Sequence, residues 1–245
     1  MENNIYKING SSFICITYDG TTSYLEIDQA IIAVNIAGPY QDTYNSYFIR
    51  GNFNSSYVNN YLKQFNFDLY TDHNFFNSKH PQIEQFLKSF EPGTYYIEQA
   101  NNFFISILES DYKLLFGDFS TQDHALLFTR NIIDLRRNII NAYKNEIIKG
   151  DRPIIIAYRK DYGYGSETGD SFIIDGHHKL MAYIELEIVP NIWEIVNIGD
   201  DNYDPTNQLL CAYLNHEEIK NTSLKYFYRY TENGLGELSD LASKF

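Results

Sequence analysis

The fold of the second half of the chain is decided by the stretch Ser171-Phe172-Ile173-Ile174-Asp175-Gly176-His177-His178-Lys179-Leu180-Met181-Ala182-Tyr183. It begins as a short apolar strand, turns at one glycine and opens an amphipathic helix that carries two histidines and a lysine. A helix that starts directly after such a turn presents unpaired backbone N–H groups and the positive end of its dipole at one point. The stretch therefore predicts an anion-binding turn at residues 175–179.

Composition excludes several classes of function. The 245 residues include 19 basic and 32 acidic side chains, a formal charge of −13, so broad nucleic-acid binding is not expected. The first residues lack the basic and apolar regions of a signal peptide, and no apolar run reaches membrane-spanning length. Cys15 and Cys211 lie far apart, which favours two free thiols. We therefore expect a cytoplasmic protein without membrane contact.

The first half of the chain has the pattern of a β-rich region. The predicted strands are residues 13–16, 24–27, 30–34 and 47–49, followed by strand patterns between Tyr95 and Phe116. Asp19-Gly20 is a strong turn signal and predicts a hairpin between the first two strands. Two helices interrupt this pattern: one covers residues 56–65, and the other begins at Pro81 and ends before Pro92-Gly93.

The second half alternates helices and strands. Apolar spacing predicts a helix from about Asn131 to Lys149, with Arg136 in the middle of its apolar stripe. Strands are predicted at 153–157, 172–174 and 192–196, with the helix of the focal stretch between the last two. The order from 131 to 196 is then helix, strand, strand, helix, strand. The tail predicts a helix at 204–214, a strand at 224–230 and a final helix at 235–242.

The sequence Asp175-Gly176-His177-His178-Lys179 resembles the D-G-H-H-R motif of the ParB/sulfiredoxin-like superfamily. The context agrees, because a helix and a Pro-Ile-Ile-Ile strand precede the motif and Val189-Pro190 with an apolar strand follows it. The similarity covers roughly residues 130–196, about a quarter of the chain. In related proteins the equivalent turn holds nucleotide phosphates. Family activities include sulfinic acid reduction, CTP hydrolysis, phosphotransfer to free serine and nuclease activity.

Departures from the motif narrow these activities. His177 stands where sulfiredoxins have their cysteine nucleophile, so sulfinic acid reduction is not expected. The two histidines make the turn most similar to that of the free-serine-kinase-like members. Lys179 in place of arginine keeps the charge but loses the bidentate fork. The catalytic glutamate of that subgroup cannot be placed on this sequence.

The two histidines differ in their expected surroundings. His177 precedes Leu180 and Ile184 by three and seven residues, so it is either a core histidine or a ligand contact. His178 lies on a polar edge of the helix, and the resemblance implies that it contacts phosphate or shuttles a proton. Adjacent histidines do not face one way on a helix, so no metal-ligand set is predicted.

The other polar residues of the turn also leave alternatives open. Asp175 either caps the helix or takes a catalytic role, by holding magnesium through water or orienting a histidine. Lys179 is either a solvated surface lysine or a phosphate partner. The resemblance implies that Gly176, His177, His178 and Lys179 form the binding site, with His178 and Asp175 as catalytic residues.

These observations predict an α+β protein with two lobes. Residues 1–118 form a β-rich lobe of unassigned family, and residues 119–245 a ParB/sulfiredoxin-like lobe with a small mixed sheet and packed helices. The implied function is binding of ATP, ADP or another nucleotide with magnesium, followed by phosphotransfer or nucleotide hydrolysis. Two alternatives stay open. One is a non-catalytic immunity or regulatory protein whose N-terminal lobe binds a protein partner and whose turn is structural, and the other is a ParB-like nuclease.

Overall fold

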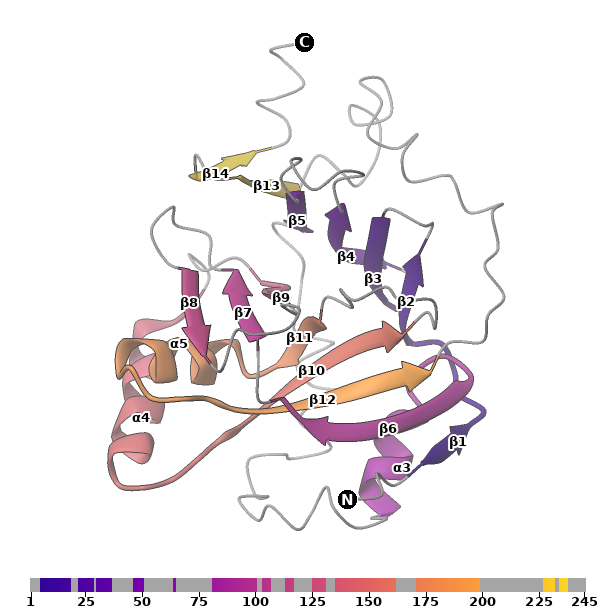
Figure 1. The fold of residues 1–245 in the computed structure, drawn as a ribbon, viewed down its shortest axis with the longest axis horizontal. Coiled ribbons are helices and arrows are strands. Elements are labelled where there is room, and N and C mark those ends of the chain that lie inside the picture. The colour runs from indigo at the N-terminus through magenta and orange to yellow at the C-terminus, as the bar shows by residue number, and fades with distance from the viewer. Residues whose placement is uncertain are drawn as a thin grey trace.

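The structure is a computed structural model. It describes residues 5–18, 22–28, 30–36, 46–50, 64, 81–100, 103–106, 113–116, 125–130, 135–161, 171–198, 227–231 and 234–237. Within these ranges the chain forms two β-sheets and three helices (Figure 1). The protein therefore has the mixed α and β content that the sequence predicts, and strands dominate. None of the helices in the described ranges is long and apolar enough to cross a membrane.

The larger sheet has eight strands and mixed direction. In spatial order they are β1 (Tyr6–Ile8), β6 (Gly93–Gln99), β12 (Asn191–Ile198), β10 (Ile154–Asp161), β11 (Ser171–Asp175), β9 (Ala125–Leu127), β7 (Phe103–Ser106) and β8 (Lys113–Phe116). The pairs β10–β12, β11–β9 and β7–β9 are parallel and the other pairs are antiparallel. β10 and β11 form an antiparallel pair. β12 is parallel to β10, and the chain between them contains β11 and a helix, since parallel strands need a long connection.

The smaller sheet has six antiparallel strands. In spatial order they are β14 (Gly234–Glu237), β13 (Phe227–Thr231), β5 (Ser46–Arg50), β4 (Ala30–Ile36), β3 (Thr22–Ile27) and β2 (Ile14–Tyr18). β2 and β3 form the predicted hairpin, with Ile14 opposite Ile27. The predicted helix at 235–242 is wrong at residues 235–237, which belong to β14. Glycines at 234 and 236 disfavour a helix there, and pairing with β13 supplies the backbone hydrogen bonds.

Three helices complete the described fold: α3 (Pro81–Leu87), α4 (Arg137–Ile148) and α5 (His177–Glu185). α3 and strands β2–β4 pack on one face of the larger sheet, and α4 and α5 pack on the other. Alternate residues of β10 therefore enter different cores: Ile154 and Ile156 face α3, whereas Ile155 and Ala157 face α4 and α5. Burial on both faces explains why the first four residues of this strand, 154–157, are an unbroken apolar run.

The order α4, β10, β11, α5, β12 confirms the predicted order of elements between 131 and 196. The start of the first helix was wrong, because α4 begins at Arg137. Arg136 occupies its N-cap position with an extended backbone (φ −81°, ψ 117°) and an exposed side chain. It therefore does not lie in the middle of an apolar stripe, and a charge at this end of the helix needs no buried partner.

Several predictions fall outside the described residues. These are the Asp19-Gly20 turn, the helix at 56–65 apart from Gln64, the helix at 204–214, and Cys211. The helix from Pro81 and the free thiol of Cys15 are confirmed. The boundary near residue 118 stays a prediction. Both sheets combine strands from either side of it.

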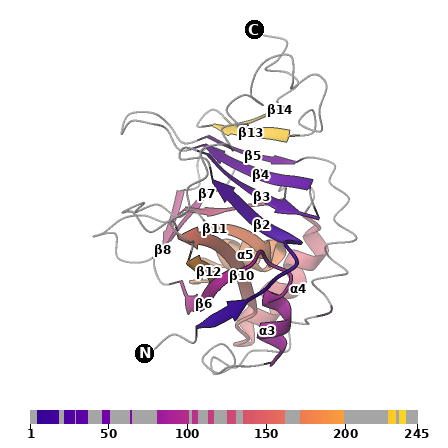
Figure 2. The ribbon, with the colours of Figure 1, turned by 90° about the vertical axis from the view of Figure 1, so that its right-hand side faces the viewer.

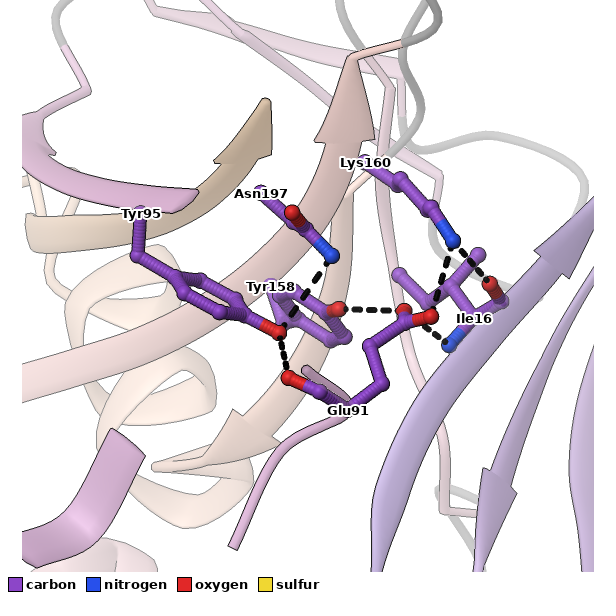
Figure 3. A network of polar contacts seen from close by, with 6 residues as sticks. All are labelled: Ile16, Glu91, Tyr95, Tyr158, Lys160 and Asn197. Carbon is purple, nitrogen blue, oxygen red and sulfur yellow. Dashed lines mark hydrogen bonds and ion pairs between the residues drawn. The ribbon is translucent and has the colours of Figure 1, made fainter. Parts of the chain in front are cut away.

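The two sheets meet at a polar network around Glu91 (Figure 3). Its carboxylate accepts hydrogen bonds from the Tyr158 hydroxyl at 2.9 Å and from the backbone N–H of Ile16 at 3.3 Å, and it pairs with Lys160 at 2.8 Å. Tyr95 donates to the Glu91 backbone carbonyl at 2.5 Å. Ile16 lies on β2, the edge strand of the smaller sheet, so Glu91 supplies an acceptor that an edge strand lacks.

Backbone contacts extend the same junction. Ile14 of β2 donates to the Ser89 carbonyl at 2.8 Å, and Glu91 N–H donates to the Ile14 carbonyl at 3.1 Å. In Figure 2 the strands of the smaller sheet follow one another from β14 to β2, and β2 lies nearest the larger sheet. The segment after α3 thus joins the two sheets through main-chain as well as side-chain hydrogen bonds.

Candidate functional site

The backbone of the turn depends on Gly176. β11 ends at Asp175, α5 begins at His177, and Gly176 between them has φ +104°, a conformation that favours glycine. A Cβ atom at this position would lie 3.0 Å from Ile155 Cγ1 and 3.1 Å from Ile155 Cα, so a side chain would fit only if Ile155 moved slightly. The helix begins with the bond from Leu180 N–H to the Gly176 carbonyl at 2.8 Å, which leaves the N–H groups of its first turn without partners inside the helix.

Lys179 is an internal donor of the turn. Its side chain is buried, and the ammonium donates to Asp175 Oδ2 at 2.9 Å and to the Ile154 carbonyl at 3.0 Å. The alternative of a solvated surface lysine is therefore wrong. Asp175 lies one residue outside the helix, because Gly176 occupies the N-cap position, and its carboxylate accepts from Lys179. Together the pair ties the first turn of α5 to β11 and β10.

His177 accepts a hydrogen bond from the segment after β9. Its Nε2 atom accepts from Thr129 N–H at 3.2 Å and lies 3.0 Å from Thr129 Oγ1, and the ring packs against Phe128. The bond from Thr129 N–H requires the lone pair on Nε2 and the ring proton on Nδ1; the Thr129 hydroxyl donates to the Ile173 carbonyl at 2.6 Å, so its contact with Nε2 is not a second hydrogen bond to the ring. Burial, with the charge of Arg130, lowers the pKa of His177 to about 3. His177 is therefore a neutral acceptor at physiological pH.

His178 makes the equivalent contact with the start of α4. Its Nε2 accepts from the backbone N–H of Arg136 at 3.0 Å, and the side chain is half-buried. The same reasoning places the proton of the neutral ring on Nδ1. Burial lowers the pKa of His178, the charges of Arg130 and Arg136 lower it further, and Asp175 opposes them. His178 therefore joins the N-terminal ends of α4 and α5 as a neutral group.

Positive charge gathers at this point although the chain as a whole is acidic. Arg130 and Arg136 both act on the His178 ring, and Arg130 also acts on His177. The N-termini of a 12-residue and a 9-residue helix add the positive ends of their dipoles. The turn and the two arginines therefore form a local cationic cluster, which we call the cationic turn: residues 175–179 with Arg130 and Arg136.

An ion-pair clamp fixes α4 against α5 beside the cationic turn. Arg137 donates two hydrogen bonds to the Glu185 carboxylate, and Lys144 donates to Glu185 Oε2 at 3.0 Å. Although burial opposes ionisation of this carboxyl, the two cations lower the pKa of Glu185 below its ordinary value. The clamp pairs Arg137 with Glu185, whereas Arg130 and Arg136 are the arginines whose charges act on the histidines.

Comparison of the chain with protein-family models, curated proteins and solved structures gives no significant match. The resemblance to the ParB/sulfiredoxin-like superfamily therefore stays a prediction from the motif and its context. The contacts of the turn stand independently of it, because they follow from the geometry of this chain alone.

Two residues that act on the histidines of the cationic turn were missed from the sequence. Thr129 and Arg130 follow the short strand β9 and carry no motif. They reach the turn because β9 runs parallel to β11, with Leu127 opposite Phe172. Arg136 was singled out only as a charge within an apolar stripe. Pairing of β9 with β11 would have identified the first two, but a three-residue strand gives no strong signal in the sequence.

Metal-binding groups are not clustered in the described part of the chain, where no three His, Cys, Asp or Glu side chains could together hold a metal ion. Asp175, for which magnesium binding through water was one open alternative, accepts a hydrogen bond from Lys179. Oxygen ligands for magnesium would have to come largely from a bound phosphate ligand and water, as is common for this ion.

Proposed function

We propose that the cationic turn binds a phosphate-bearing ligand, with a nucleotide as the first candidate. The observation that supports it best is the convergence of two helix N-termini with Arg130 and Arg136 in a chain of formal charge −13. Backbone N–H groups at a helix N-terminus and arginine side chains are the donors that proteins use for phosphate.

The residues of the turn would divide this work between them. Backbone N–H groups of Gly176–His178 would cradle the anion, and Arg130 and Arg136 would supply opposing charge. His178 could donate from Nδ1 while its Nε2 keeps the contact with Arg136. Lys179, which is buried, and His177, which is partly buried, would hold the turn in shape through their internal contacts.

The resemblance indicates which ligand and reaction to test first. It favours ATP or ADP with magnesium, followed by phosphotransfer or nucleotide hydrolysis, with His178 and Asp175 as the proposed catalytic residues. Each of these two side chains already has a hydrogen-bond partner within the protein: His178 Nε2 accepts from Arg136 N–H, and the Asp175 carboxylate accepts from Lys179. Any proton transfer by His178 would therefore use Nδ1.

One set of contacts favours the second candidate, a non-catalytic protein with a structural turn. All four side chains of the motif are held by internal hydrogen bonds of 2.9–3.2 Å: Asp175, His177, His178 and Lys179. A purely structural role of the turn would be sufficient to account for these hydrogen bonds. In this case function would lie in recognition of a protein partner by the N-terminal half.

The test is thermal unfolding with ATP, ADP, CTP, GTP and inorganic pyrophosphate, each with and without magnesium. A ligand that binds only the folded protein stabilises it by about 2.7 kcal/mol at a concentration of roughly 100 times its Kd. We expect Arg136→Ala to weaken binding by about tenfold, since one charged hydrogen bond contributes roughly 1.5 kcal/mol. Arg136 is exposed, so this variant should fold normally.

Lys149→Ala is the matched control, because exposed Lys149 lies at the opposite end of α4 and the charge change is the same. It should bind like the wild type. Equal weakening in both variants would mean that net charge, and not this site, governs binding. If no nucleotide or pyrophosphate shifted the unfolding temperature, the non-catalytic alternative would be preferred.

A further inference from the structure

Two acceptor contacts attach the residues before α4 to the first turn of α5. His177 Nε2 accepts from Thr129 N–H at 3.2 Å, and His178 Nε2 accepts from Arg136 N–H at 3.0 Å. We call these the histidine contacts. One donor, the backbone N–H of Arg136, belongs to an arginine that acts on His178. The other, the backbone N–H of Thr129, precedes the second such arginine, Arg130. The histidine contacts therefore position the charges of the cationic turn.

Both contacts exist only while the imidazoles are neutral. A protonated imidazole carries N–H on both nitrogens and has no acceptor left. Protonation of His178 would place one N–H donor against another across the present 3.0 Å separation. It would also add a third positive charge beside Arg130 and Arg136.

The groups that face His178 come from three elements. Arg130 follows β9 and Arg136 precedes α4, and both disfavour protonation; Asp175 at the end of β11 favours it but is paired with Lys179. His177 is the titratable neighbour on α5 itself. The pKa of His177 lies at about 3, so His177 stays neutral at mildly acidic pH and the following inference concerns His178.

We propose that a proton on His178 breaks its contact with Arg136 and thereby releases the anion, so that the cationic turn binds at neutral pH and loses its ligand on acidification. This inference rests on the proposed function, because it concerns the regulation of the same site. The proposed loss of anion affinity in acid is the opposite of what charge alone predicts, because an added imidazolium charge would strengthen anion binding. The sign of the pH dependence therefore decides it.

The direction follows from the pKa. The pKa of His178 is lowered from its ordinary value of 6.5 by burial and by the two arginines. The contact is therefore complete above that value, and it is lost only as the pH falls below it, through the lowered pKa of the folded protein. Because the ligand binds more tightly while His178 is neutral, linkage requires that bound ligand favour the neutral imidazole, so acid release should begin at a lower pH as ligand concentration rises.

Inorganic sulfate is the probe, because its charge does not change over the range tested. Binding is followed by NMR from about pH 7.5 to about pH 5, the range in which histidine titrates. We expect the affinity of the wild type to fall roughly five- to tenfold, the effect of losing one hydrogen bond. His178→Gln retains a side-chain acceptor that does not titrate, so its affinity should not fall in acid.

A measurement without ligand separates the switch from the proposed function. The amide N–H signal of Arg136 should shift and exchange faster on acidification in the wild type but not in His178→Gln. Absence of sulfate binding at every pH would overturn both proposals. Sulfate binding that strengthens in acid, or an Arg136 amide that does not respond, would overturn only the switch.

Discussion

At the scale of single residues, the turn depends on a glycine whose two constraints can be measured separately. Gly176 combines a positive φ of +104° with a close approach to Ile155, whereas Gly150, after α4, has φ +106° and nothing within 4 Å of the point that a Cβ atom would occupy. Backbone strain of this kind costs about 1–3 kcal/mol for a residue with a side chain. Gly150→Ala therefore gives the cost of strain alone.

We expect Gly176→Ala to lower the free energy of unfolding by more than Gly150→Ala, by about 1–3 kcal/mol, because Ile155 must also move. Urea denaturation of both variants measures this difference. Since Ile155 belongs to the core under α5, Gly176→Ala should also weaken anion binding. Equal destabilisation by the two substitutions would show that the strand relaxes without cost.

The residues of the site were predictable to different degrees. Gly176 and the helix start could be inferred because a strand, a glycine and a helix are signalled by neighbouring residues. The burial of Lys179 could not, because its acceptor, the Ile154 carbonyl, is 25 residues away in the chain. The contacts of His177 and His178 lie 48 and 42 residues away, and no spacing in the sequence indicates them.

At the scale of elements, α4 and α5 are held together by the clamp on Glu185. Glu185→Gln removes the charge that Arg137 and Lys144 share and should destabilise the protein by about 0.5–1 kcal/mol, as expected for partly exposed ion pairs. Thermal unfolding at low salt measures the loss. Added salt should diminish it, because salt screens exposed charges.

Glu146→Gln is the control for this substitution, since it removes the same charge from an exposed position on α4. It should change stability little. If Glu185→Gln behaved in the same way at every salt concentration, packing between the helices, including Ile140 with Leu180, would be sufficient to hold them.

Elements were easier to predict than their ends and partners. The order α4, β10, β11, α5, β12 follows from local periodicity. The start of α4 was misplaced because Leu135 continues the helical spacing of the apolar residues, although it precedes the first residue of the helix. β14 was misassigned because its conformation is determined by pairing with β13, which a helical pattern over 235–242 does not reveal.

At the scale of the whole molecule, the two sheets combine segments that are distant in sequence. β6, from the first half, lies between β1 and β12, and β13, near the C-terminus, pairs with β5. Such pairing depends on buried surface and hydrogen bonds that form only after the chain has folded back, so the composition of the sheets could not be derived from local patterns. The junction around Glu91 shows where this long-range order is fixed (Figure 3).

Glu91→Ala tests that junction. The substitution removes the acceptor of the Tyr158 hydroxyl and of Ile16 N–H and the carboxylate partner of Lys160. Loss of a partly buried partner with several hydrogen bonds should cost about 1–3 kcal/mol, measured by urea denaturation. Glu84→Ala on α3 is the control, because its ion pair with Lys88 is exposed and 3.9 Å long and should contribute little.

The location of the effect distinguishes a junction from a local polar cluster. If Glu91 joins the sheets, hydrogen exchange of the Ile16 amide on β2 should accelerate together with that of neighbouring amides of β3, because the edge strand loses its attachment to the larger sheet. Exchange confined to Tyr158 and its neighbours on β10 would contradict this. In that case the backbone bonds between Ile14 and residues 89–91 alone would hold the smaller sheet in place.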